Sequence, residues 1–268
     1  MPRIPQIALS AALGTVLILL ASTSASATAA TSYVDIADLT VTAPTLVRAT
    51  ITRAERISVK DSPGLPPGSA RLLITAAVNA SLVAPGAIPA SLQWLWDAPL
   101  DARGRVPKAK GLVVLAWLAP PAADGKTQLV ARGAQLPWDS ATEATARAIA
   151  TEARSGTVPI VTGVRNGFRA DGTIPGESES QFFLTTRDGK DLTMIVTTKP
   201  GEARGVAIAR GDVIDESAVK VVPGTLLHYR LACFLKPDLP AAISDPALAA
   251  DWRAALAAIG PCGRSPGP

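Results

Sequence analysis

Short apolar runs separated by turn residues constrain this fold more than any other feature of the sequence. In the first half, these runs occupy residues 45–59, 70–83, 90–99, 111–119 and 127–136. Proline- and glycine-rich stretches such as 62–69 separate them. Leu92, Trp94 and Trp96 recur at every second position, which places them on one face of a strand. This spacing is typical of a sandwich or small barrel, so we expect residues 28–138 to form a β-rich domain.

One helical segment interrupts this β pattern. Residues 139–156 are rich in alanine, and Ser140 with Glu143 fits a capping box that would start a helix. Gly156 is a suitable end for this helix. Its apolar stripe is thin and consists of Ala144, Ala148 and Ile149. We therefore expect a surface helix that connects two β-rich regions.

The second β-rich region is expected over residues 157–268, together with a C-terminal helix. Its apolar runs occupy residues 158–168, 181–186, 191–198, 206–214 and 225–235. Asp188 and Gly189 predict a tight hairpin between two of these runs. Asp245 and Pro246 are suited to the start of a helix. The helix carries one apolar stripe, formed by Leu248, Trp252, Leu256 and Ile259. The fold class we expect is therefore mainly β with a few helices.

The first 27 residues have the features of a cleavable signal peptide. Arg3 supplies the basic start, and residues 7–20 are apolar. The small residues from Ala21 onward fit the A-x-A pattern of a signal-peptide cleavage site. The apolar segment is shorter than a membrane-spanning helix requires. We therefore expect a periplasmic or secreted protein with no transmembrane segment after cleavage.

The chain has two cysteines, Cys233 and Cys262. Outside the cytoplasm, an even number of cysteines predicts disulfide pairing, so we expect one bond between them that tethers the last helix. One histidine and two cysteines are too few for a typical metal site, and no cofactor motif occurs. We expect neither a metal nor a cofactor.

The charge balance is mild, with 26 basic and 22 acidic residues and a formal net charge of +4. Basic residues are densest at 103–110, in a stretch that contains no aromatic residue. Nucleic-acid interfaces usually combine a basic patch with a recognisable motif. We expect no nucleic-acid partner.

Acidic residues in the segment 169–180 are the first candidates for chemistry. Asp171, Glu177 and Glu179 lie in what the glycine content predicts to be a long loop. Paired carboxylates can carry glycoside hydrolysis. A solvated loop with no catalytic role is the alternative.

His228 is the other candidate, because it is the only histidine in the chain. A Ser-His-Asp triad would need it as the general base, but the sequence has no G-x-S-x-G motif to supply the nucleophile. If residues 225–235 form a strand, His228 and Arg230 share one face. We expect a solvent-side or interfacial position for His228.

The segments 60–76, 159–184 and 228–240 carry a resemblance to uncharacterised exported proteins of alphaproteobacteria. No activity is assigned to that group, so the resemblance implies location only. The strand order of the N-terminal half loosely resembles an OB-type barrel of the netrin/TIMP kind, although the cysteines that begin such inhibitors are missing.

These observations favour a non-enzymatic binding or envelope-associated module whose partner is an unknown protein or envelope component. One alternative is an extracytoplasmic hydrolase that uses the acidic residues of the 169–180 segment. A second alternative is an inhibitor module of the netrin/TIMP type.

Overall fold

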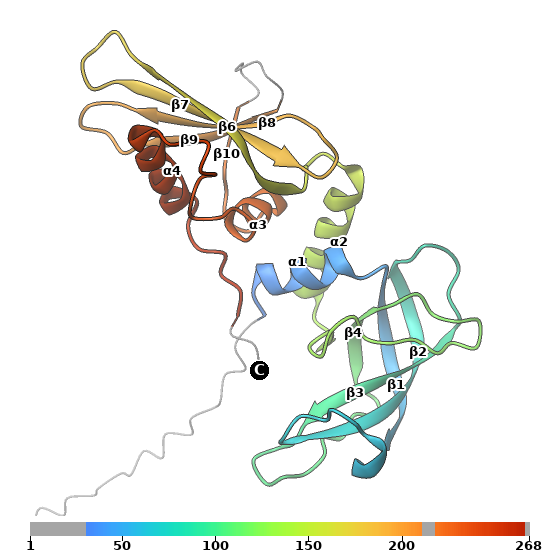
Figure 1. The fold of residues 1–268 in the computed structure, drawn as a ribbon. Helices are drawn as coiled ribbons and strands as arrows, with labels where there is room; N and C mark the ends of the chain where they lie inside the picture. The colour runs from blue at the N-terminus through green and yellow to red at the C-terminus, as the bar shows by residue number, and fades with distance from the viewer. Residues whose placement is uncertain (1–30, 211–217, 266–268) are drawn as a thin grey trace, which may run out of the picture. The chain divides into compact units, whose positions relative to one another are not determined.

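The computed structural model describes residues 31–210 and 218–265 (Figure 1). The expected signal peptide at residues 1–27 lies outside them, as does the end of the apolar run 206–214. The described residues contain two five-stranded antiparallel sheets and four α-helices, so the protein is mainly β, as its sequence predicted. From Thr31 onward the chain forms one compact unit.

The first sheet forms a half-barrel with the strand order β3-β2-β1-β4-β5. Its strands are β1 (Thr45–Arg56), β2 (Ser69–Val83), β3 (Ser91–Pro99), β4 (Val113–Leu118) and β5 (Gln135–Pro137), and the short 3₁₀ helix η1 (Val59–Asp61) precedes β2. Leu92 and Trp94 are fully buried on one face of β3, as their spacing predicted. The Trp94 indole donates a hydrogen bond of 2.7 Å to the buried Gln135 Oε1, which fixes β5 to the core.

The segment 125–130 bridges the two sides of the half-barrel. Gln93 on β3 donates to the Gly125 carbonyl and accepts from Thr127, both at 2.9 Å, and Ala119 next to β4 donates to Gln128. Gly125 has a φ of 82°, and a Cβ there would collide with the carbonyl of Ser91. The prediction of a continuous strand over residues 127–136 was therefore wrong. The backbone of the segment 125–130 makes hydrogen bonds both to β3 and to the residue after β4. Within the expected range, only β5 forms a regular strand.

The second sheet has the strand order β10-β9-β8-β7-β6. Its strands are β6 (Val161–Asp171), β7 (Ser178–Thr186), β8 (Leu192–Thr198), β9 (Gly205–Arg210) and β10 (Val219–Lys220). Asp188 and Gly189 lie in the tight turn between β7 and β8, as predicted. Helix α4 (Pro246–Ile259) packs against this sheet (Figure 1). The ring of Trp252 lies 5.1 Å from that of Phe182, so Trp252 anchors the core.

The helices α1 (Tyr33–Thr42) and α2 (Ser140–Ser155) pack against each other. The sequence did not lead us to expect α1. The surface position expected for α2 was wrong, because Ala146, Ile149 and Ala150 are buried in the core shared with α1. The expected capping box was also wrong. Asp139 caps α2 by accepting from the backbone of Thr142 at 2.8 Å.

Residues 226–232 form a helix, α3 (Leu226–Ala232), where we expected a strand. Thr225 caps it by accepting a hydrogen bond from the backbone of His228. Leu226, Tyr229 and Arg230 are buried at a spacing of three and four residues, which is the helical period. The apolar residues of the run 225–235 are compatible with the period of a strand and with that of a helix. The N-cap formed by Thr225 identifies the segment as a helix.

The disulfide between Cys233 and Cys262 forms as the sequence predicted. It joins the end of α3 to the segment after α4. None of the helices in the described residues is long and apolar enough to cross a membrane.

Candidate functional site

The three acidic candidates lie on the hairpin formed by β6 and β7. Both strands run further than expected, so the connecting loop is residues 172–177 rather than 169–180. Asp171 is 82% exposed and pairs with Arg169 at 3.2 Å, and Glu179 accepts from Gln181 at 2.8 Å. Among the described residues, no hydrogen bond or ion pair joins Asp171, Glu177 and Glu179 to one another or to His228.

His228 lies on α3 rather than on a strand, and it is buried beside α4, whereas we considered a solvent-side or an interfacial position. Its Nε2 lies 3.1 Å from the Ile259 carbonyl at the end of α4, and its Nδ1 has no partner in the structure. Among the described residues, the His228 ring thus has one hydrogen-bond partner, the backbone at the end of a neighbouring helix. The structure does not bring the sequence candidates together.

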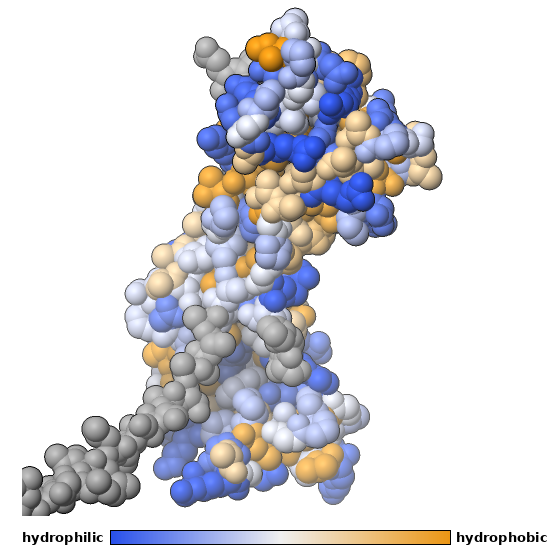
Figure 2. All heavy atoms as spheres, turned by 90° about the vertical axis from the view of Figure 1, so that its left-hand side faces the viewer, coloured by the Kyte–Doolittle hydropathy of each residue, from blue (hydrophilic) through white to orange (hydrophobic). Residues whose placement is uncertain are grey.

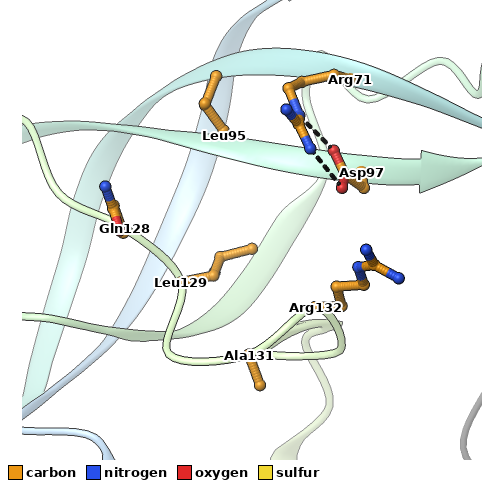
Figure 3. A pocket seen from close by; sticks show the side chains of 7 residues that line it. All are labelled: Arg71, Leu95, Asp97, Gln128, Leu129, Ala131 and Arg132. Carbon is orange, nitrogen blue, oxygen red and sulfur yellow. Dashed lines mark hydrogen bonds and ion pairs between the residues drawn. The ribbon is translucent and has the colours of Figure 1, made fainter. Parts of the chain in front are cut away.

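A cavity of about 270 Å³ lies between β2, β3 and the segment 128–132. Figure 3 shows the side chains that line it. Its charged groups already have partners. Arg71 makes two hydrogen bonds to Asp97, at 2.7 and 2.9 Å, and Arg132 donates to the Gly64 carbonyl at 3.1 Å. The hydrogen bond and charge of Arg71 lower the pKa of Asp97 despite its burial. This cavity has little unused charge for a ligand.

A larger cavity, of about 530 Å³, lies between α1, α3 and the start of β6, and we call it the arginine cavity. Its charged lining consists of three guanidinium groups and one carboxylate, namely Arg187, Arg230, Arg264 and Asp38. Apolar side chains such as Ile160 and Phe234 complete the walls. The lining therefore combines cationic and apolar side chains.

One wall of the arginine cavity is a closed hydrogen-bond network around Asp38. Arg264 makes two bonds to the Asp38 carboxylate, at 2.6 and 3.0 Å, and the Tyr229 hydroxyl donates to the same carboxylate at 2.7 Å. Burial, this hydrogen bond and the charge of Asp38 raise the pKa of Tyr229. The phenol thus stays protonated at neutral pH. This network neutralises Asp38 and fixes the wall.

Arg230 differs from the other charged groups because it is buried without a partner. The residue is only 5% exposed, yet in the described part of the chain its guanidinium makes no hydrogen bond or ion pair. Burial lowers its pKa, and the charge of Glu152 opposes that effect. Arginine nevertheless remains protonated in proteins. A buried charge is normally paired by direct contact, whereas among the described residues Glu152 acts on Arg230 through its charge without a hydrogen bond or ion pair.

The chemistry of this cavity is suited to binding. A guanidinium group presents several N–H donors in a planar fork that matches a carboxylate or phosphate. Among the described residues that line this cavity, there is no histidine, cysteine or serine that could act as a base or nucleophile. In the described residues, no group of three or more His, Cys, Asp or Glu side chains is placed to hold a metal ion.

No protein-family model matches the chain, and no curated protein is similar to it. The site must therefore be interpreted from its own residues.

Sequence reasoning missed the arginine cavity, although one signal pointed to it. Arg264 lies two residues after Cys262, and Tyr229 and Arg230 lie shortly before Cys233. The predicted disulfide implied that these residues meet in space. Arg187 and Asp38 lie far from both cysteines in the sequence, so nothing in the sequence indicated that they line this cavity.

Proposed function

We propose that this chain is an exported, non-enzymatic binding protein that takes an organic anion in the arginine cavity. The buried and unpaired guanidinium of Arg230 carries this proposal. A ligand oxyanion would supply its missing partner, and Arg187 would add positive charge at the same cavity.

The proposed location rests on two features of the chain. The first 27 residues have the composition of a signal peptide. The disulfide Cys233–Cys262 is typical of proteins that fold in an oxidising compartment. The proposed partner is thus a component of the envelope or of the surroundings of the cell that carries a carboxylate or phosphate group.

Thermal unfolding in the presence of small anions tests the binding proposal. A ligand that binds only the folded state raises the Tm as its concentration rises. We expect benzoate and inorganic phosphate to raise the Tm of the protein but not that of the Arg230→Gln variant.

The matched control is Arg165→Gln, which removes the same charge from a side chain that is 62% exposed on β6. This variant should respond to the anions as the unchanged protein does. Equal Tm shifts in Arg230→Gln and the unchanged protein would show that the anions act elsewhere, and the proposal would then fail.

A further inference from the structure

A second cavity, of about 400 Å³, adjoins the arginine cavity. The two cavities share Val41, Ile160 and Arg230 as lining residues. Arg230 is therefore part of the wall of both, and a molecule held by its guanidinium can extend in either direction.

The second cavity is mostly apolar. Its walls come from the end of α1, the end of β2 and one face of α2, and they include Ala43, Val83, Pro85, Ala150 and Ala153. The hydroxyl of Thr40, which also lines it, already accepts a hydrogen bond of 3.0 Å from the Trp117 indole. Besides Arg230, the only charged residue in this lining is Arg154, which is exposed.

Small side chains create the space in this second cavity. Ala150 and Ala153 are on α2, and leucine at either position would extend into it. Figure 2 shows the face that carries α4, where hydrophilic and hydrophobic residues are interspersed. The apolar surface that a ligand body would cover lies inside the second cavity.

We propose, building on the function proposed above, that the ligand is a free amphiphilic organic anion. Its oxyanion head pairs with Arg230, and its apolar body crosses Val41 and Ile160 into the second cavity. Burial of that body removes apolar surface from water, which adds affinity that a bare anion lacks. The head fits a carboxylate or a phosphate monoester, since both match the guanidinium fork.

Calorimetric titration of the full mature chain with a series of probes tests this assignment. Decanoate and decyl phosphate should bind at least ten times more tightly than acetate and inorganic phosphate, and decanol should bind more weakly than decanoate. Comparison of decanoate with decyl phosphate distinguishes the two kinds of head. Equal affinity for acetate and decanoate would overturn the amphiphilic ligand while leaving the anion site in place. No binding of any anion would overturn both proposals.

The variant Ala153→Leu tests where the apolar body lies. Ala153 lines the second cavity but is only partly buried, so leucine there should fold. We expect it to weaken decanoate binding at least tenfold and to leave phosphate binding unchanged. The matched control is Ala148→Leu, which adds the same side chain to an exposed position of α2 and should change neither. Equal loss in both variants, or no loss in Ala153→Leu, would overturn this placement.

Discussion

Arg264 and Asp38 form a two-pronged ion pair, with Nε–Oδ2 and Nη2–Oδ1 distances of 2.6 and 3.0 Å, between residues 226 positions apart in the sequence. The disulfide at Cys262 holds Arg264 close to this partner. The pair closes one wall of the arginine cavity, and among the described arginines that line it, Arg230 is the buried one without a hydrogen bond or ion pair. Contacts that the C-terminal segment makes with α1 thus shape the site that we propose binds the ligand.

Replacing Arg230 by methionine should stabilise the ligand-free protein. A buried charge without a partner costs free energy, and an apolar side chain of similar length removes that cost, so we expect the free energy of unfolding to rise by about 1–2 kcal/mol. Urea denaturation measures the change. A loss of more than about 1 kcal/mol would mean that Arg230 has a stabilising role in the folded chain.

Removing the disulfide with Cys233→Ser and Cys262→Ser should destabilise the protein by about 3–4 kcal/mol, since the bond closes a sequence separation of 29 residues. Guanidinium denaturation of the double variant measures this loss. Anion binding should weaken as well, because Arg264 would no longer be held at Asp38. If the double variant folds and binds anions as tightly as the unchanged protein, the disulfide is not needed to hold Arg264 at Asp38 in the wall of the arginine cavity.

Asp251 on α4 should be among the most sensitive charged residues. It is 1% exposed and binds Arg169, Arg204 and Ser180, at 2.6, 3.0 and 2.7 Å. Asp251→Ala would leave two arginines without their buried partner, and we expect a loss of about 3–5 kcal/mol in urea denaturation. The control is Asp171→Ala, which also removes a carboxylate that pairs with Arg169. Because Asp171 is exposed, its removal should cost less than about 0.5 kcal/mol.

The cross-strand pair of Arg71 and Asp97 should make stability depend on pH. The Arg71 hydrogen bond lowers the pKa of Asp97 below its ordinary value of 3.8. A lowered folded-state pKa contributes stability that is fully present above the unfolded-state value and is lost as the pH falls through the folded-state value. Urea denaturation should therefore show a smaller loss between about pH 5 and pH 2 in Asp97→Asn than in the unchanged protein. The same loss in both would show that Asp97 does not contribute.

The strength of the local signals explains which parts of the fold could be predicted. Leu92 and Trp94 alternate strictly on β3, and Asp245 with Pro246 marks the start of α4, so both elements could be located from the sequence. The stretch around His228 fitted a strand and a helix equally well, and only the Thr225 cap resolves it. The segment before Gln135 bridges two strands, which no local pattern encodes.

The candidate site was harder to predict than the fold. Its charged residues come from α1, α3, the turn after β7 and the C-terminal segment, and their sequence positions show no spacing that implies contact. The unpaired state of Arg230 depends on the burial of α3 and on packing that keeps Glu152, whose charge acts on Arg230, out of hydrogen-bond contact with it. Neither property is visible before the elements are packed together.

A crystal structure with bound bromodecanoate, labelled at the end of its chain, tests the central claim most directly. The carboxylate should lie within hydrogen-bond distance of the Arg230 guanidinium, and the anomalous signal of the bromine should lie beside Ala150 and Ala153. A bromine signal elsewhere, with the carboxylate at Arg230, would contradict only the path of the apolar body. A ligand bound away from Arg230, with that guanidinium still unpaired, would contradict the account as a whole.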